Sequence, residues 1–117
     1  MEREDLNKKV DLAFLSAFYG GMLTEKQRQI LSLHCEEDLS LGEIAEEVGI
    51  TRQAVHETLS RAADRLKRME DSLGAAKRFR RMVSGLEEAL SSLRNRDYIR
   101  AEQLLNGLLE DEESSGI

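Results

Sequence analysis

The sequence predicts an all-α protein, with a helix-turn-helix core and a helical C-terminal extension. Its 117 residues include no proline and no tryptophan, and the absence of proline removes the commonest helix breaker. Apolar residues recur every three or four positions, and no segment alternates like a strand. A charged fraction of 34% beside 40% apolar residues suits helices with one buried and one solvated face.

The first two helices are delimited by clear start and stop signals. One is expected from about Glu4 to Tyr19, ended by the following glycine pair. Another begins at Thr24, where "TEKQ" forms a capping box, and it ends at "EEDLS". The first helix carries one apolar stripe, made of Leu6, Val10, Ala13, Phe14, Ala17 and Phe18.

A third, short helix is expected over about 41–47, capped by Ser40 and Glu43, with Gly49 supplying the positive φ of a tight turn. Thr51 then opens a long helix. Its heptad-like apolar seam breaks at Arg80, and Gly74 and Gly85 leave room for two helices with a bend. The seam consists of Val55, Leu59, Ala62, Leu66, Met69, Leu73 and Ala76.

The segment "RDYIRAEQLLNGLLEDE" is expected to form a short last helix before a frayed tail. We therefore divide the chain into a helix-turn-helix domain over 1–70, a helical extension over 71–113 and a disordered tail over 114–117. The apolar stripe of the extension exceeds what the first domain can cover, so it should pack on the N-terminal helix or on a second chain. Because two-fold dimers are the commonest oligomers, we predict a homodimer with the C-terminal helices at its interface.

The stretch "SLGEIAEEVGITRQAVHETLSRA", residues 40–62, has the pattern of a helix-turn-helix. Glutamine pairs with adenine, and arginine pairs with guanine or phosphate. His56 either donates to a phosphate or is a solvated surface histidine, whereas Glu57 repels phosphate. The apolar set that holds the two helices is Ile44, Ala45, Val48, Ile50, Val55 and Leu59. The candidate nucleic-acid-binding residues are Thr51, Arg52, Gln53, His56, Ser60 and Arg61.

The formal net charge of −6 conceals one basic block. Residues 51–83 carry nine basic and four acidic residues, a net charge of +5, while residues 24–50 and 84–117 are each at −5. This block is either a nucleic-acid footprint or a helix paired with acidic neighbours, and both interpretations stay open. Its candidate basic patch is Arg65, Lys67, Arg68, Lys77, Arg78, Arg80 and Arg81.

Other chemistry finds little support in the residues. The single cysteine, Cys35, excludes an intramolecular disulfide, and neither a signal peptide nor a membrane span is recognisable. A cytoplasmic location is the expectation. His34 and Cys35 are helix neighbours about 100° apart, so they cannot share a metal. We expect no catalytic residues, no metal, no cofactor and no enzymatic activity.

The stretch "LTEKQRQILSLHCEEDLSLGEIAEEVGITRQAVHETLSRA" resembles region 4, the promoter-reading domain of bacterial sigma-70 factors. It is more similar still to the YlxM-like family of helix-turn-helix proteins, through "FYGGMLTEKQR", "DLSLGEIAEE" and "TRQAVHETLSRA". The resemblance spans roughly residues 5–70. Against the sigma pattern, Gln53, His56 and Glu57 replace an acid, an arginine and an amide.

The resemblance implies a bacterial, all-helical protein whose genes lie beside those of the signal recognition particle (SRP). It therefore implies a regulatory or accessory role in that pathway, with SRP RNA, the SRP GTPase or DNA as partner. The competing hypothesis is a transcriptional regulator that reads DNA with Arg52, Gln53, His56 and Arg61.

Overall fold

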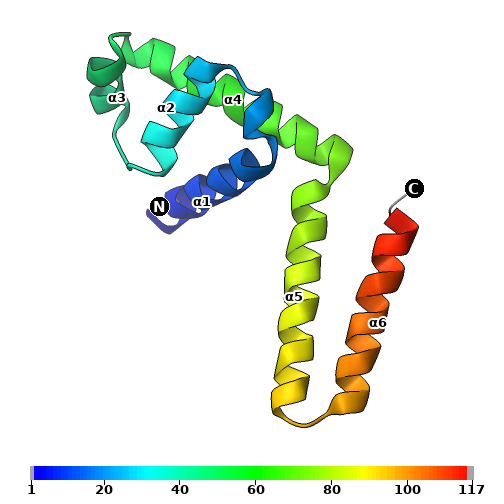
Figure 1. Ribbon diagram of the computed structural model, residues 1–117. Coiled ribbons are helices and arrows are strands. Elements are labelled where there is room, and N and C mark those ends of the chain that lie inside the picture. The colour runs from blue at the N-terminus through cyan, green and yellow to red at the C-terminus, as the bar shows by residue number, and fades with distance from the viewer. Residues whose placement is uncertain (1, 116–117) are drawn as a thin grey trace. The chain divides into compact units, whose positions relative to one another are not determined.

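A computed structural model describes the backbone of residues 2–115 and the side chains of residues 8–113 (Figure 1). Within this part every regular element is a helix and there is no strand, which confirms the predicted all-α fold. The helices are α1 (Glu2–Tyr19), α2 (Glu25–Cys35), α3 (Leu41–Val48), α4 (Arg52–Leu73), α5 (Ala75–Arg94) and α6 (Tyr98–Ser115), with a 3-10 turn, η1 (Gly20–Met22).

Contacts divide the chain into two compact units after Ala76, six residues beyond the boundary expected from the sequence. Unit 1 holds α1 to α4 and the first two residues of α5, and unit 2 holds the rest of α5 together with α6. The last helix continues to Ser115, so residues 114–115 are helical where a disordered tail is expected. Residues 116–117 lie outside the described part.

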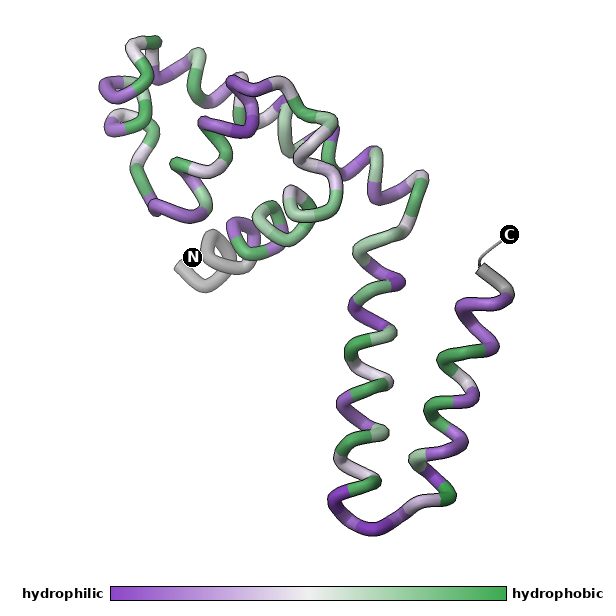
Figure 2. Tube along the Cα trace, viewed as in Figure 1, coloured by the Kyte–Doolittle hydropathy of each residue, from purple (hydrophilic) through white to green (hydrophobic). Residues whose placement is uncertain are grey.

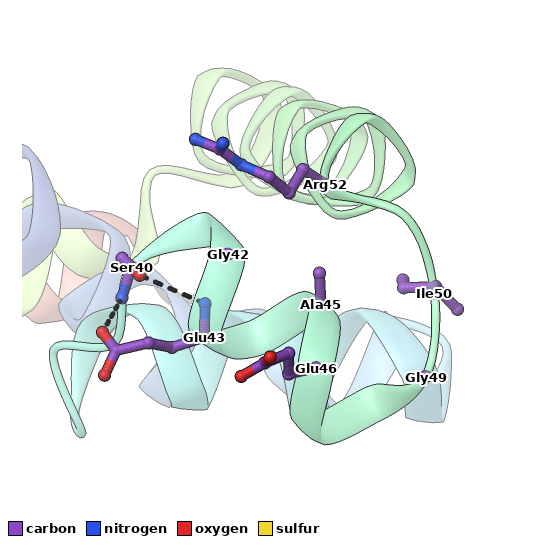
Figure 3. Close-up of a pocket in the computed structure, with 8 residues that line it drawn as sticks. All are labelled: Ser40, Gly42, Glu43, Ala45, Glu46, Gly49, Ile50 and Arg52. Carbon is purple, nitrogen blue, oxygen red and sulfur yellow. Dashed lines mark hydrogen bonds between the residues drawn. The ribbon is translucent and has the colours of Figure 1, made fainter.

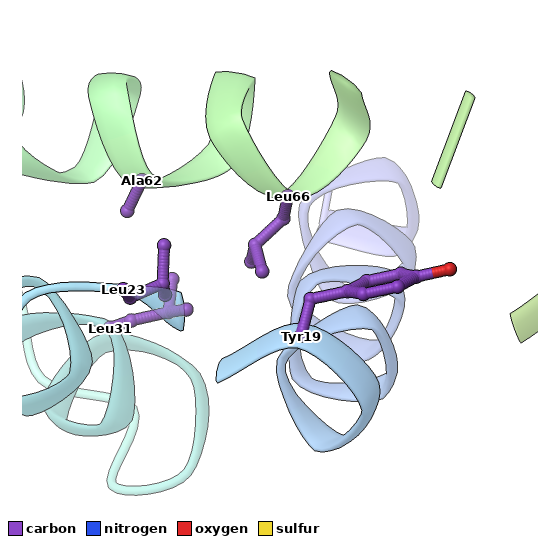
Figure 4. Packing of buried hydrophobic residues seen from close by; sticks show 5 residues of the cluster. All are labelled: Tyr19, Leu23, Leu31, Ala62 and Leu66. Carbon is purple, nitrogen blue, oxygen red and sulfur yellow. The ribbon is translucent and has the colours of Figure 1, made fainter. Parts of the chain in front are cut away.

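Unit 1 is built around two apolar clusters that share the long helix α4. The first joins Tyr19, Leu23 and Leu31 to Ala62 and Leu66 of α4 (Figure 4). The second joins α2 and α3 to the start of α4 and comprises Ile30, Ile44, Ala45 and Val55. The predicted seam from Val55 to Met69 is therefore the inner face of α4 in this unit's own core. Its last two members depart from the prediction, because Leu73 is 55% exposed and Ala76 belongs to α5.

The stripe predicted for α1 is not its buried face. Leu12, Leu15 and Tyr19 pack against the first cluster, whereas Val10 is 55% exposed and Phe18 is 37% exposed. At 100° per residue the two sets lie on opposite sides of the helix. Periodicity fits both sets, and the contacts with α2 and α4 decide between them. Leu6 lies outside the residues whose side chains are described.

A small hydrogen-bond network closes unit 1 where α4 ends. Gly74 adopts φ 64° and ends α4 in the left-handed conformation that favours glycine. The buried Tyr19 hydroxyl donates to Glu70 Oε1 over 2.6 Å and accepts from the Ala75 N–H over 3.0 Å. Glu70 Oε1 also accepts from the Ala76 N–H over 3.0 Å. Two N–H groups of the first turn of α5, which have no partner within the helix, are satisfied in this way.

Unit 2 is an antiparallel helical hairpin (Figure 1). The connection over 95–97 turns through Arg96, at φ 60°, and Asp97 Oδ1 accepts from the Arg100 N–H over 3.2 Å. Gly85 does not bend the chain. It lies inside α5, where the Leu108 side chain covers its Cα, and a Cβ at this position would stand 2.7 Å from Leu108 Cδ2.

Candidate nucleic-acid interface

The first helix of the motif, α3, is fixed at both ends by local hydrogen bonds. Ser40 Oγ accepts from the Glu43 N–H over 3.1 Å, and Glu43 Oε1 accepts from the Ser40 N–H over 2.9 Å. These hydrogen bonds hold the pKa of the Glu43 carboxyl below its usual value, so the carboxylate stays charged. At the other end Gly49 adopts φ 79°, as the sequence predicts for the turn.

The second helix, α4, is anchored to α3 from its first turn. Thr51 caps it, because its Oγ1 accepts from the Ala54 N–H over 3.0 Å. Val55, one turn further, is fully buried against Ile44 and Ala45. Val48, Ile50 and Leu59 pack at the edge of the same cluster. The predicted apolar set therefore holds the helix-turn-helix, and it leaves the opposite side of α4 free.

The six candidate residues of the recognition helix are all exposed. Opposite Val55, at 100° per residue, the outermost line of α4 runs through Gln53, Glu57 and Ser60. Glu57 is exposed and stands in the middle of this surface, so a carboxylate would face whatever the helix enters. The candidate residues are Thr51, Arg52, Gln53, His56, Ser60 and Arg61.

Arg52 is directed back across α3 (Figure 3). A Cβ at Gly42 would lie 3.8 Å from Arg52 Nε. The Arg52 side chain therefore lies directly over Gly42, in space that a larger residue at position 42 would also need. The shallow depression beneath it is also lined by Glu43 and Glu46. Gly42 was not predicted from the sequence, in which its only signal is a glycine inside a short helix.

A row of arginines extends the interface along α4. Arg61, Arg65 and Arg68 follow spacings of four and three, which place them on one flank of the helix. All three are exposed, and none forms an ion pair with any residue in the described part of the chain. A parallel line of Glu57, Asp64 and Asp71 lies beside them, and Lys67 is on the opposite flank.

The other four residues of the predicted basic patch belong to unit 2. Lys77, Arg78, Arg80 and Arg81 occupy the first turns of α5 and are exposed. The acidic residues 110–113 end α6, and the antiparallel hairpin brings them to the same end of unit 2. The structure thus distributes the predicted basic patch over two units, with the arginine row of α4 in unit 1.

Comparison with known families identifies the motif. A family described as "Putative helix-turn-helix protein, YlxM / p13 like" matches residues 6–106. The chain belongs to this family. The match extends from α1 into α6, so it includes both units and confirms the family expected from the sequence.

Several bacterial relatives of the YlxM-like family support the assignment, and each is named a UPF0122 protein. One from Desulforamulus reducens is 46% identical over 79 residues, covering 68% of each chain. One from Bacillus mycoides is 42% identical, covering 74% of this chain and 81% of the relative. One from Acetivibrio thermocellus is 38% identical, covering 79% of each chain.

Other chemistry is sparse in this YlxM-like chain. Burial raises the pKa of the Cys35 thiol, and this side chain packs at the edge of the first cluster as a small apolar residue. Among the described residues no group of three or more His, Cys, Asp or Glu could hold a metal ion. None of the described helices is long and apolar enough to cross a membrane.

Proposed function

We propose that this protein is a non-enzymatic regulatory or accessory component of the bacterial SRP pathway that binds the particle's RNA along the basic flank of α4. The observation that supports this proposal most strongly is the row of Arg61, Arg65 and Arg68, exposed and without ion pairs among the described residues. The link to the SRP comes from the family resemblance stated for the sequence. We further propose that the protein acts as a homodimer.

Backbone contact fits this surface better than insertion into a groove. A helix inserted into the DNA major groove places its outermost line against the base edges. Here that line carries Glu57 and Asp64, and the depression beside the helix start carries Glu43 and Glu46. The arginine row can instead follow a phosphate backbone while these carboxylates stay in solvent. Double-stranded RNA is recognised mainly through its shape and backbone.

The alternative function is that of a helix-turn-helix regulator of transcription. It is favoured by the exposed Gln53 at the start of α4, which can pair with an adenine. In that case Gln53→Ala should abolish the preference for one DNA sequence, whereas a backbone reader should be indifferent to the change.

Fluorescence anisotropy against SRP RNA, a random DNA duplex and the SRP GTPase tests the proposal. The full chain should bind the RNA saturably, and binding should weaken steeply between about 50 and 200 mM salt. Arg61→Ala combined with Arg65→Ala should weaken binding by about tenfold and reduce the salt dependence.

The matched control is Lys26→Ala combined with Arg28→Ala, which removes the same charge from exposed positions of α2. This control should bind almost like the unmodified protein. Charge reversal at Lys77, Arg78, Arg80 and Arg81 tests whether the basic residues of unit 2 also contribute to RNA binding. Binding to the GTPase without binding to RNA would contradict the proposal and make the helix-turn-helix a protein-docking surface.

A further inference from the structure

The hairpin of unit 2 exposes large apolar side chains along both of its helices. Figure 2 shows apolar positions recurring between polar ones down α5 and α6. Leu86 is 46% exposed, Leu90 is 47% exposed and Leu109 is 63% exposed. Seven of the large, exposed apolar residues of unit 2 are Phe79, Leu86, Leu90, Leu93, Tyr98, Leu105 and Leu109.

These residues do not form the contact between α5 and α6. That contact runs along the small, buried residues Ala89, Ser92 and Ala101, and it includes the Leu108 side chain packed over Gly85. At 100° per residue, the exposed apolar residues lie about a quarter turn from this contact on each helix, in the same rotational sense along the chain. Because the helices are antiparallel, both stripes emerge on one face of the hairpin.

The opposite face of the hairpin is polar. Glu88 and Arg100 are on that side, about a quarter turn from the contact in the other sense, and their Oε2 and Nη2 atoms lie 4.0 Å apart. Ser84 and Ser91 of α5 point the same way and are exposed. The ion pair across this face supports the helical geometry that places the apolar residues together on the other one.

We propose that a second copy of this chain covers the apolar face of the hairpin, so that two hairpins form a four-helix bundle. The seven exposed side chains, five leucines and two aromatic residues, are between 39% and 63% accessible. A contiguous face of this kind is on the scale of the largest apolar patch of an ordinary monomer, about 300–600 Å², and such patches commonly mark interaction sites. Each partner in a stable interface buries roughly 800 Å², so this face can supply most of one side of such an interface.

Charge and spacing favour a second copy over an unrelated partner. The stripe of α5 advances in steps of seven, four and three residues from Phe79 to Leu93, the spacing of helices in bundles. The hairpin also carries both signs of charge at one end, basic over 77–81 and acidic over 110–113. Two hairpins packed with these ends together can place each basic turn near the partner's acidic one.

Light scattering and sedimentation of the full chain test the interface. At micromolar concentration the unmodified protein should have twice the chain mass of 13.3 kDa. Leu86→Glu combined with Leu90→Glu should give the monomer mass. Leu90→Ala, a milder change, should raise the dimer dissociation constant by at least about tenfold, because each interface loses the side chain twice.

The matched control is Ser84→Glu combined with Ser91→Glu, which adds the same charge to the polar face of the same helix and should remain dimeric. Circular dichroism verifies that each variant keeps its helices. A monomeric unmodified protein, or a dimer that persists in the Leu86 and Leu90 glutamate variant, would overturn the interface. The inference refines the proposed homodimer, and its test contains no nucleic acid, so it fails or succeeds independently of RNA binding.

Discussion

Tyr19 combines a core position with a polar role that its residue type alone does not reveal. Its ring is buried beside Leu66, while its hydroxyl connects Glu70 to the N–H of Ala75. Burial, together with the hydrogen bond to Glu70, raises the pKa of this tyrosine. The hydroxyl therefore stays protonated and can donate and accept at the same time.

Replacing Tyr19 by phenylalanine should lower the free energy of unfolding by about 1–3 kcal/mol, because Glu70 and the Ala75 N–H both lose a buried partner. Urea denaturation followed by circular dichroism measures the change. Ser72→Ala is the control, since it removes a hydroxyl group from an exposed position of α4, and it should leave stability almost unchanged. Equal effects of the two variants would show that the network does not stabilise the fold.

At the scale of elements, the helix caps and turns that depend on short local sequence patterns could be predicted. The capping boxes at Thr24 and Ser40, the cap at Thr51 and the turn at Gly49 all form as the sequence indicates. These features depend on residues within four positions of one another. Their outcome is decided by local hydrogen bonds and by one backbone conformation, and both are visible in the sequence.

Features decided by distant contacts were not predictable in the same way. Apolar residues occur on both sides of α1, and only the contacts of Leu12, Leu15 and Tyr19 select the buried one. The position of Arg52 over Gly42 likewise depends on how α3 and α4 cross. The arginines of α4 were named from the sequence, but whether they form ion pairs depends on side-chain positions in the folded chain, and among the described residues they form none.

Two glycines of the extension look alike in the sequence and behave differently. Gly74 adopts a left-handed conformation and ends α4, whereas Gly85 is helical and lies beneath Leu108. Gly107 of α6 has nothing within 4 Å of its would-be Cβ. Whether such a glycine ends a helix or lies under a neighbouring side chain depends on the helix that packs against it. The sequence pattern of one segment does not contain this information.

Gly85 and Gly107 therefore give opposite predictions for the stability of the hairpin. Gly107→Ala should stabilise it by about 0.5–1 kcal/mol, because alanine favours the helix and meets no neighbour. Gly85→Leu should destabilise it by about 1–3 kcal/mol, because the new side chain overlaps Leu108. Thermal unfolding by circular dichroism measures both changes, and equal stability of the two variants would contradict the contact.

On the scale of the whole molecule, the two units are unequal in how they bury apolar residues. Both apolar clusters lie in unit 1, and the Tyr19 network completes that unit at Ala75 and Ala76. Among the described residues of unit 2, the buried side chains are the small ones of Ala89, Ser92 and Ala101, and the half-buried Leu108 lies over Gly85. We therefore expect unit 1 to be the part of the chain that folds by itself.

A fragment of residues 1–76 should unfold cooperatively and give well-dispersed amide signals in NMR spectra. A fragment of residues 1–73 is the matched control, because it keeps α4 but lacks the Ala75 and Ala76 N–H groups. It should be less stable than the longer fragment, since Tyr19 and Glu70 lose their backbone partners. An unfolded 1–76 fragment would show that unit 1 depends on unit 2.

The small residues between α5 and α6 have a consequence for how the protein responds to its own abundance. A hairpin that buries Ala89, Ser92 and Ala101 gains little from closing alone, so most of its apolar stabilisation would come from pairing with another hairpin. Association would then add to the stability of a hairpin that is already helical, and the melting temperature of unit 2 should rise with protein concentration. The expression level of the protein would then set how stable unit 2, the C-terminal third of the chain, is in the cell.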